Sequence, residues 1–333
     1  MTCFLHQAAL ALLVTATISM PAANAYTTTR KFNPGHYTVL LHSQGEQRYM
    51  DDARRPGMRG ITKKYYWREL EPSRGIYDLA EIRADLDWAQ AYGMQLIIMI
   101  EDKTFQLERP NPAYLDSLTP RNRAGGYTMV RWSPIVVERY KALVAAIGKR
   151  FDAHLNFEGI AAQETALGLD SATLQKFGYT PEKYRDASIA MYGYALSAMP
   201  RSRLFWYQNY FVGNQAYIGS VAAALGPKGL VMAGPDVLPD SKSLNEKSYV
   251  YFHQMRDKMH LGIQVEGLVY RAQHLTNDTP MKYWSMGELF QFARDQLHVN
   301  YMFWVRVPKP TPADSNDWYD ALPVIEANPV FGQ

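Results

Sequence analysis

Two glutamates stand at the ends of apolar runs whose composition predicts buried strands. Glu164 ends the run "FEGIAAQE", and Glu266 ends the run "LGIQVE". An ionised carboxylate is costly to bury unless it is paired or needed for chemistry. Along the second run Gln264 and Glu266 share one face of the strand, while Ile263 and Val265 share the other. The two glutamates are therefore candidates for one common site.

Two carboxyl groups that face each other across a cleft are what the cleavage of a glycosidic bond requires. One protonates the leaving oxygen, and the other attacks or stabilises the anomeric carbon; a separation of roughly 5–5.5 Å gives retention of configuration. The acid must hold its proton near neutral pH, and apolar burial raises a carboxyl pKa in that direction. This chemistry depends on elements that bring the ends of distant strands together.

Eight short apolar runs alternate with longer segments of helical periodicity, which favours a parallel sheet. The runs are 37–43, 60–67, 95–101, 157–164, 204–210, 229–234, 261–267 and 301–307. This alternation predicts a single (β/α)₈ TIM barrel, α/β in class, whose site lies at the carboxyl ends of the strands. A doubly wound open sheet is the alternative, and the lack of a Gly-rich phosphate loop after the first run disfavours it.

Helix-start signals mark three of the intervening segments. Asp78, with Glu81 three residues further on, forms a capping-box pattern. Ser133 and Thr180 are each followed by a proline at the expected first helical position. These signals predict helices that begin at about residues 79, 134 and 181.

The first 25 of the 333 residues have the pattern of a secretory signal peptide, an apolar stretch that ends in small residues in an A-x-A arrangement. We therefore expect a barrel domain over 26–333 and a secreted or periplasmic protein with no integral membrane segment. The sole cysteine, Cys3, lies in the signal, and the histidines show no paired spacing, so we expect no metal site. The net charge of +3, with Lys and Arg scattered, excludes a basic stripe for nucleic acid.

The residues at the strand ends resemble those of a known group of enzymes. The large clan of retaining (β/α)₈ glycoside hydrolases that includes cellulases, mannanases and β-galactosidases has its acid/base glutamate at the end of strand four. Its nucleophile ends strand seven, and Glu164 and Glu266 match these two positions. The segment "YYWRELEPSRGIYDLAEI" resembles the strand-two region of these enzymes, and Trp304 matches a strand-eight tryptophan that floors the sugar subsite. The clan has Asn directly before the acid/base, where this chain has Gln163.

The resemblance implies a glycosidase that acts on an oligo- or polysaccharide without a cofactor, as a monomer. Glu164 is then the general acid and base, and Glu266 is the nucleophile. Gln163 contacts the sugar 2-hydroxyl, Trp304 stacks on the sugar, and Tyr270 supports the nucleophile. The candidate substrate-binding residues are Gln163, Trp304, Trp67, Tyr210, Asn209, His42, Asp236 and Tyr270.

Other interpretations of the same residues remain open. Glu101, Asp102 or Asp236 could replace one member of the pair, with a wider carboxyl separation and inversion as the outcome. Glu164 could serve only in a structural ion pair. A barrel that binds glycans without cleaving them is a second function. A polysaccharide lyase that uses Tyr210 and Arg306 is a third.

Overall fold

The computed structural model describes residues 30–41, 47–266, 284–306 and 318–332. Within them eight parallel strands form a closed barrel in chain order, because β1 pairs with both β2 and β8. The strands are β1 (Gly35–Leu40), β2 (Met58–Tyr66), β3 (Gln95–Glu101), β4 (Phe157–Ala162), β5 (Arg203–Tyr207), β6 (Leu230–Gly234), β7 (Leu261–Val265) and β8 (Tyr301–Val305). The predicted (β/α)₈ barrel is confirmed.

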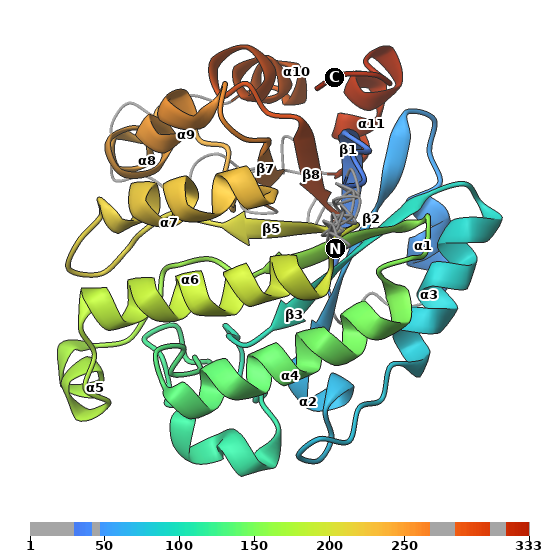
Figure 1. The fold of residues 1–333 in the computed structure, drawn as a ribbon. Helices are drawn as coiled ribbons and strands as arrows, with labels where there is room; N and C mark the ends of the chain where they lie inside the picture. Colours follow the sequence, from blue (N-terminus) through green and yellow to red (C-terminus); the bar gives the residue numbers. More distant parts are fainter. Residues whose placement is uncertain (1–29, 42–46, 267–283, 307–317, 333) are drawn as a thin grey trace, which may run out of the picture.

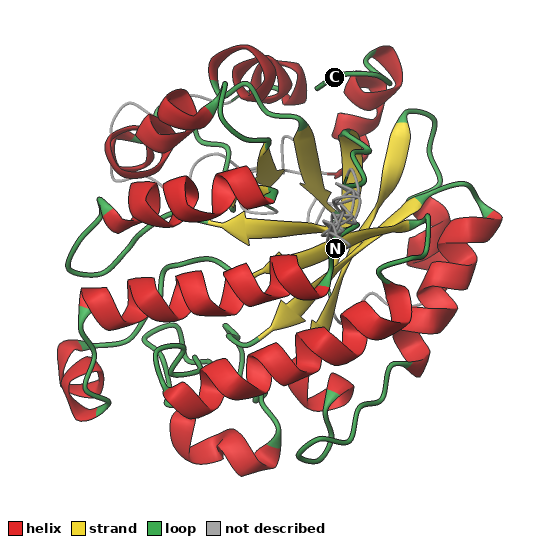
Figure 2. Cartoon of the chain, viewed as in Figure 1, coloured by secondary structure: helices red, strands yellow, loops and turns green. Residues whose placement is uncertain are grey.

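Helices surround the strands (Figures 1 and 2). The α-helices are α1 (Gln47–Asp52), α2 (Trp67–Leu70), α3 (Ala80–Ala91), α4 (Pro134–Phe151), α5 (Ser171–Lys176), α6 (Pro181–Ala198), α7 (Tyr217–Leu225), α8 (Lys242–Leu244), α9 (Val250–Met255), α10 (Met286–Gln291) and α11 (Trp318–Ala327). The long helices α4 and α6 pack against each other on the outside of the barrel.

The two faces of each strand belong to two separate cores. On β8, Tyr301, Phe303 and Val305 point into the barrel, whereas Met302 and Trp304 point outward to the helices. Inside the barrel, aromatic rings fill the space, and the rings of Tyr301 and Phe303 lie parallel. This alternation is the period of two that strand geometry imposes. It also decides which residues can reach the cavity at the mouth.

The helix starts agree with the sequence at two of three positions. Helix α4 has Ser133 as its N-cap residue with proline following it, and the Thr180 hydroxyl caps α6 by accepting from the Lys183 N–H. The capping box predicted at Asp78 is wrong. The N-cap of α3 is Leu79, and the Asp78 carboxylate accepts from the Ala80 N–H just past it.

The amino-terminal ends of the strands are closed by the segment 30–33. Buried Glu158 accepts hydrogen bonds from the Asn33 N–H at 3.1 Å, from the Asn33 side chain at 2.7 Å and from the Tyr301 hydroxyl at 2.7 Å. The Arg30 guanidinium donates to carbonyl oxygens at the end of α6, among them Leu196 O at 2.7 Å. This end of the barrel is therefore a bonded, filled layer.

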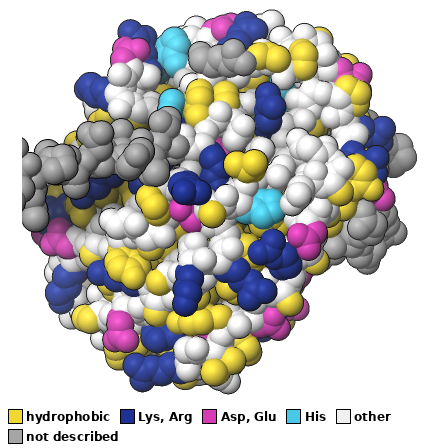
Figure 3. Space-filling view, turned by 45° about the vertical axis from the view of Figure 1, so that its right-hand side comes forward, with side chains coloured by type: hydrophobic (Ala, Val, Ile, Leu, Met, Phe, Trp, Pro, Cys, Tyr) yellow, Lys and Arg dark blue, Asp and Glu magenta, His cyan; other side chains and the backbone are white. Residues whose placement is uncertain are grey.

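The surface shows no large single-sign patch on the face in Figure 3, where Lys and Arg side chains lie in several separate places. Among the described residues, no helix is long and apolar enough to span a membrane.

Candidate active site

A cavity of about 630 Å³ opens at the carboxyl ends of the strands. Residues at the ends of all eight strands contribute to its lining, as expected for the site-bearing face of this fold. The lining residues at or just after the strands are Leu41, Lys64, Tyr66, Met99, Glu101, Gln163, Glu164, Tyr207, Pro235, Asp236, Gln264, Glu266 and Val305. The predicted pair of glutamates thus faces one shared space.

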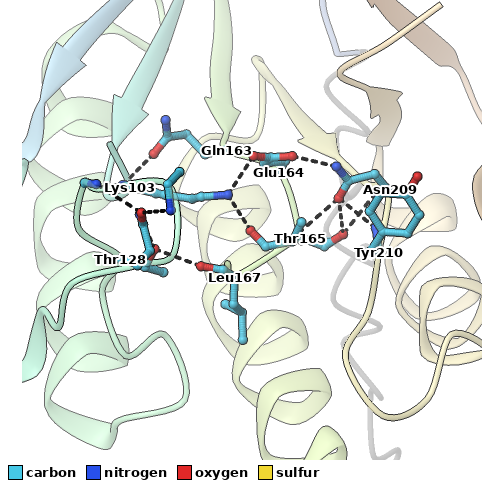
Figure 4. A network of polar contacts seen from close by, with 12 residues as sticks. Lys103, Thr128, Gln163, Glu164, Thr165, Leu167, Asn209 and Tyr210 are labelled. Atoms are coloured by element: carbon cyan, nitrogen blue, oxygen red, sulfur yellow. Dashed lines mark hydrogen bonds and ion pairs between the residues drawn. The ribbon is translucent and has the colours of Figure 1, made fainter. Parts of the chain in front are cut away.

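Both carboxyl oxygens of Glu164 accept hydrogen bonds (Figure 4). The Lys103 ammonium lies 2.7 Å from Oε1, and the Asn209 side-chain amide nitrogen lies 2.5 Å from Oε2. The Arg131 guanidinium also donates to the backbone carbonyl of Glu164 at 2.6 Å. Glu164 is therefore fixed at its backbone and at both ends of its carboxyl group.

The two partners of Glu164 are themselves held in place. Lys103 is buried, and its ammonium makes a second bond to Ala166 O at 2.7 Å. Burial lowers the pKa of Lys103, and the neighbouring Glu164 charge opposes that shift. The Asn209 side-chain oxygen accepts hydrogen bonds from the backbone N–H groups of Ala166 and Tyr210. The side-chain amide nitrogen of Asn209 must therefore face Glu164.

Gln163 has an equally defined orientation. Its side-chain oxygen accepts from the backbone N–H groups of Asp102 at 2.8 Å and Lys103 at 2.7 Å. The amide nitrogen consequently points toward Glu101, 3.4 Å away, and the cavity. Gln163 therefore presents an N–H donor to the cavity.

Asp236, just after β6, lines the cavity between the two glutamates in strand order. Burial, together with the charges of Glu164 and Glu266, raises the pKa of Asp236 to about 7. Its carboxyl group accepts no hydrogen bond from any of the residues that the structure describes. A carboxyl in this setting favours its neutral form.

The other two acidic competitors differ in setting. Asp102 makes a two-point ion pair with buried Arg131, at 2.6 and 2.7 Å, and its contacts are structural. Glu101 lines the cavity, with the Lys64 ammonium 3.8 Å away. Of the three, Asp236 and Glu101 reach the cavity, and Asp102 does not line it.

Two of the predicted substrate-binding residues, Trp304 and Trp67, are buried and do not line the cavity. Trp304 has no exposed surface, and its indole N–H donates to His36 at 3.0 Å behind the barrel wall. Its neighbour Val305 takes the inward position instead. Trp67 is also fully buried, with its indole N–H on Glu71 and its ring against Tyr140 of α4.

The remaining predicted residues fall in several places. Asn209 does not line the cavity but donates a hydrogen bond to the Glu164 carboxylate. Asp236 and Gln163 line the cavity. Tyr210 and Arg306, the pair considered for a lyase, are absent from the cavity lining; Arg306 lies over the rings of Tyr49 and Trp318. His42 and Tyr270 lie outside the described residues.

Sequence reasoning missed the cavity residues Tyr207, Lys64, Tyr66, Phe105, Gln106 and Glu108, and the cation Lys103. Tyr207 was detectable, because it shares the inward parity of Phe205 on β5. The Tyr207 hydroxyl and the Gln264 side-chain oxygen are buried without a hydrogen-bond partner in the described part of the chain. Such atoms favour a polar ligand in this cavity. The described residues contain no cluster of three His, Cys, Asp or Glu that could hold a metal ion.

No protein-family model and no curated protein matches the chain. Solved structures do match its fold. A β-galactosidase from the psychrophilic Marinomonas ef1 aligns with a TM-score of 0.58 at 12% identity, over 88% of this chain and 59% of that one. The catalytic domain of a β-amylase from Paenibacillus polymyxa has a TM-score of 0.58 at 10% identity, over 89% and 99%. Endo-glycoceramidase II from Rhodococcus sp. has a TM-score of 0.55 at 12% identity, over 87% and 78%. At these identities the likeness shows the barrel fold.

Proposed function

We propose that this protein is a glycoside hydrolase that cleaves an oligo- or polysaccharide with retention of anomeric configuration. One observation carries the proposal: Glu164 and Glu266, from β4 and β7, line a single cavity at the mouth of the barrel. The solved structures that share the fold include enzymes named for action on glycans, which supports the class. With residues 1–25 as a signal peptide, the enzyme acts outside the cytoplasm on glycans it meets there.

The reaction needs one ionised and one protonated carboxyl group beside the anomeric carbon. Glu266, at the end of β7, is the attacking carboxylate. The resemblance to the retaining clan assigns the proton donor to Glu164 on β4. Gln163 donates an amide N–H to a sugar hydroxyl, and the buried Tyr207 hydroxyl and Gln264 oxygen offer further partners at the cavity wall.

The test is a screen of aryl glycosides and polysaccharides with the full mature chain. We expect hydrolysis of at least one substrate, and proton NMR of the first product should show the anomeric configuration of the starting glycoside. Glu266→Gln should lower kcat by about a thousandfold or more, equivalent to about 4 kcal/mol of transition-state stabilisation.

The matched control is Asp257→Asn, which neutralises an exposed carboxylate far from the cavity lining. It should keep the wild-type rate. Binding of glycans without turnover by the wild-type protein would contradict hydrolysis and support the glycan-binding function. Unsaturated products that absorb in the near ultraviolet would instead identify a lyase.

A further inference from the structure

The contacts of Glu164 suit a carboxylate that stays ionised. Lys103 holds one oxygen and Asn209 holds the other, so both face N–H donors. A proton on Glu164 would place its O–H against one of these donors. It would also leave the buried Lys103 ammonium without its carboxylate partner, which is unfavourable in a site with little water.

The surroundings of Asp236 are the opposite. No described residue donates a hydrogen bond to its carboxyl group, and its closest charged neighbours at the mouth are the like charges of Glu164 and Glu266. An ionised Asp236 would therefore face two other carboxylates without a hydrogen-bond donor from the described residues. Its neutral form avoids this repulsion and keeps a proton available at the cavity surface.

Asp236 and the proposed nucleophile follow neighbouring strands of the barrel. Gly234 of β6 pairs with Ile263 of β7, and Asp236 and Glu266, which follow these two strands, line the same cavity. The two carboxyl groups therefore face one cavity from the ends of adjacent strands.

We propose that Asp236, in place of Glu164, is the catalytic acid and base of this site, with Glu266 as nucleophile. This inference rests on the proposed function and changes one role in it. Glu164, held by Lys103 and Asn209, then orients the sugar, and its charge helps to keep Asp236 protonated.

Asp236 transfers its proton to the glycosidic oxygen as the bond from that oxygen to the anomeric carbon breaks, and the bonding pair goes to the leaving oxygen. Glu266 supplies an electron pair to the anomeric carbon and forms a glycosyl ester. The Asp236 carboxylate then takes a proton from water, the hydroxyl attacks the anomeric carbon, and the ester bond breaks to restore Glu266.

The titration of Asp236 depends on every element around it. Glu164 of β4 and Glu266 of β7 raise its pKa by their charge, after burial as the larger cause. Tyr249 packs from the segment after β6, with its hydroxyl on the Asp236 backbone oxygen at 2.9 Å. Lys64, Glu101 and Glu108 share the cavity from the β2 and β3 side. When Glu266 becomes an ester, it loses its charge, and the pKa of Asp236 falls. The ionised Asp236 carboxylate can then act as the base in the second step.

The test uses Asp236→Asn and Glu164→Gln with two glycosides of the sugar that the substrate screen identifies. One carries 2,4-dinitrophenolate, which leaves without protonation, and the other carries phenolate, which needs an acid. For Asp236→Asn we expect kcat on the phenyl glycoside to fall at least a hundredfold further than on the dinitrophenyl glycoside. The basic limb of its pH profile should disappear, and azide should restore turnover.

Glu164→Gln should lose rate on both glycosides by the same factor and keep the basic limb. If Glu164→Gln shows the selective loss on the phenyl glycoside and Asp236→Asn does not, the inference is wrong and Glu164 is the acid, while the proposed function stands. If the wild-type protein cleaves no glycoside, the proposed function fails.

Carbon-13 NMR of the aspartate carboxyl groups tests the protonation independently of any substrate. The Asp236 signal should titrate near pH 7 in the wild-type protein and at lower pH in Glu266→Gln. A signal that is already ionised at pH 5 would contradict the inference.

Discussion

The two ends of the barrel treat buried carboxyl groups in opposite ways. At the amino-terminal end, Glu158 is fully buried and accepts three hydrogen bonds from Asn33 and Tyr301. At the mouth, Asp236 lines a cavity of about 630 Å³ and receives none from the described residues. The amino-terminal end is filled and hydrogen-bonded. The mouth encloses a cavity in which the Asp236 carboxyl group lies near other carboxylates. Carboxyl burial alone therefore does not identify a functional residue, whereas a cavity-lining carboxyl group with a raised pKa and no hydrogen-bond donor among the described residues does point to one.

The largest effect on stability should come from the filled end. Glu158→Gln would turn an amide N–H₂ toward donors of Asn33 and Tyr301, so several buried bonds would be lost. We expect the free energy of unfolding to fall by about 2–4 kcal/mol in equilibrium denaturation with urea. A loss below about 0.5 kcal/mol would mean that this layer is not a stabilising one.

Asp236 should show a smaller effect with a distinctive pH dependence. The folded protein keeps the Asp236 proton up to about pH 7, whereas an unfolded chain releases it near pH 4. Ionisation of Asp236 therefore costs folding free energy as the pH rises from about 4 through 7, and the cost is complete above that range.

Asp236→Asn removes this cost. The variant should gain stability relative to wild type between pH 5 and pH 8, by on the order of 1–2 kcal/mol, since partial access of water reduces the effect. Urea denaturation at the two pH values measures the difference, with Asp257→Asn as control. A constant difference between wild type and variant would contradict the raised pKa of Asp236.

Trp304→Phe should change stability by no more than Asp236→Asn does, and it distinguishes a residue of the barrel wall from one that lines the cavity. The variant loses the indole bond to His36 and leaves a small void behind β8. We expect about 1–2 kcal/mol less stability and an unchanged KM. A raised KM at unchanged stability would restore Trp304 as a sugar-contacting residue.

The sequence predicted the barrel well because its strands are apolar runs that are buried on both faces. It also placed Glu164, Glu266, Gln163 and Asp236 at the mouth, since polar residues that directly follow such runs must lie at the carboxyl ends of the strands. These predictions depend only on local pattern and chain order.

The failures have physical causes as well. Trp304 was assigned by a short motif, although its position between inward-facing Phe303 and Val305 puts it outside the barrel. The ion pair of Glu164 with Lys103 and its bond to Asn209 join loops after three different strands, and no local pattern encodes such contacts. The protonation of Asp236 likewise depends on which charges the fold brings near it.

The most direct test of the account is the rate of glycoside hydrolysis per folded molecule in Glu266→Gln and Glu158→Gln, two variants that neutralise one glutamate at each end of the barrel. We expect Glu266→Gln to lose about a thousandfold or more in rate and to unfold at the same urea concentration as the wild-type protein. Glu158→Gln should unfold earlier and keep the wild-type rate per folded molecule. A fully active Glu266→Gln protein would contradict the placement of catalysis at the mouth of this barrel.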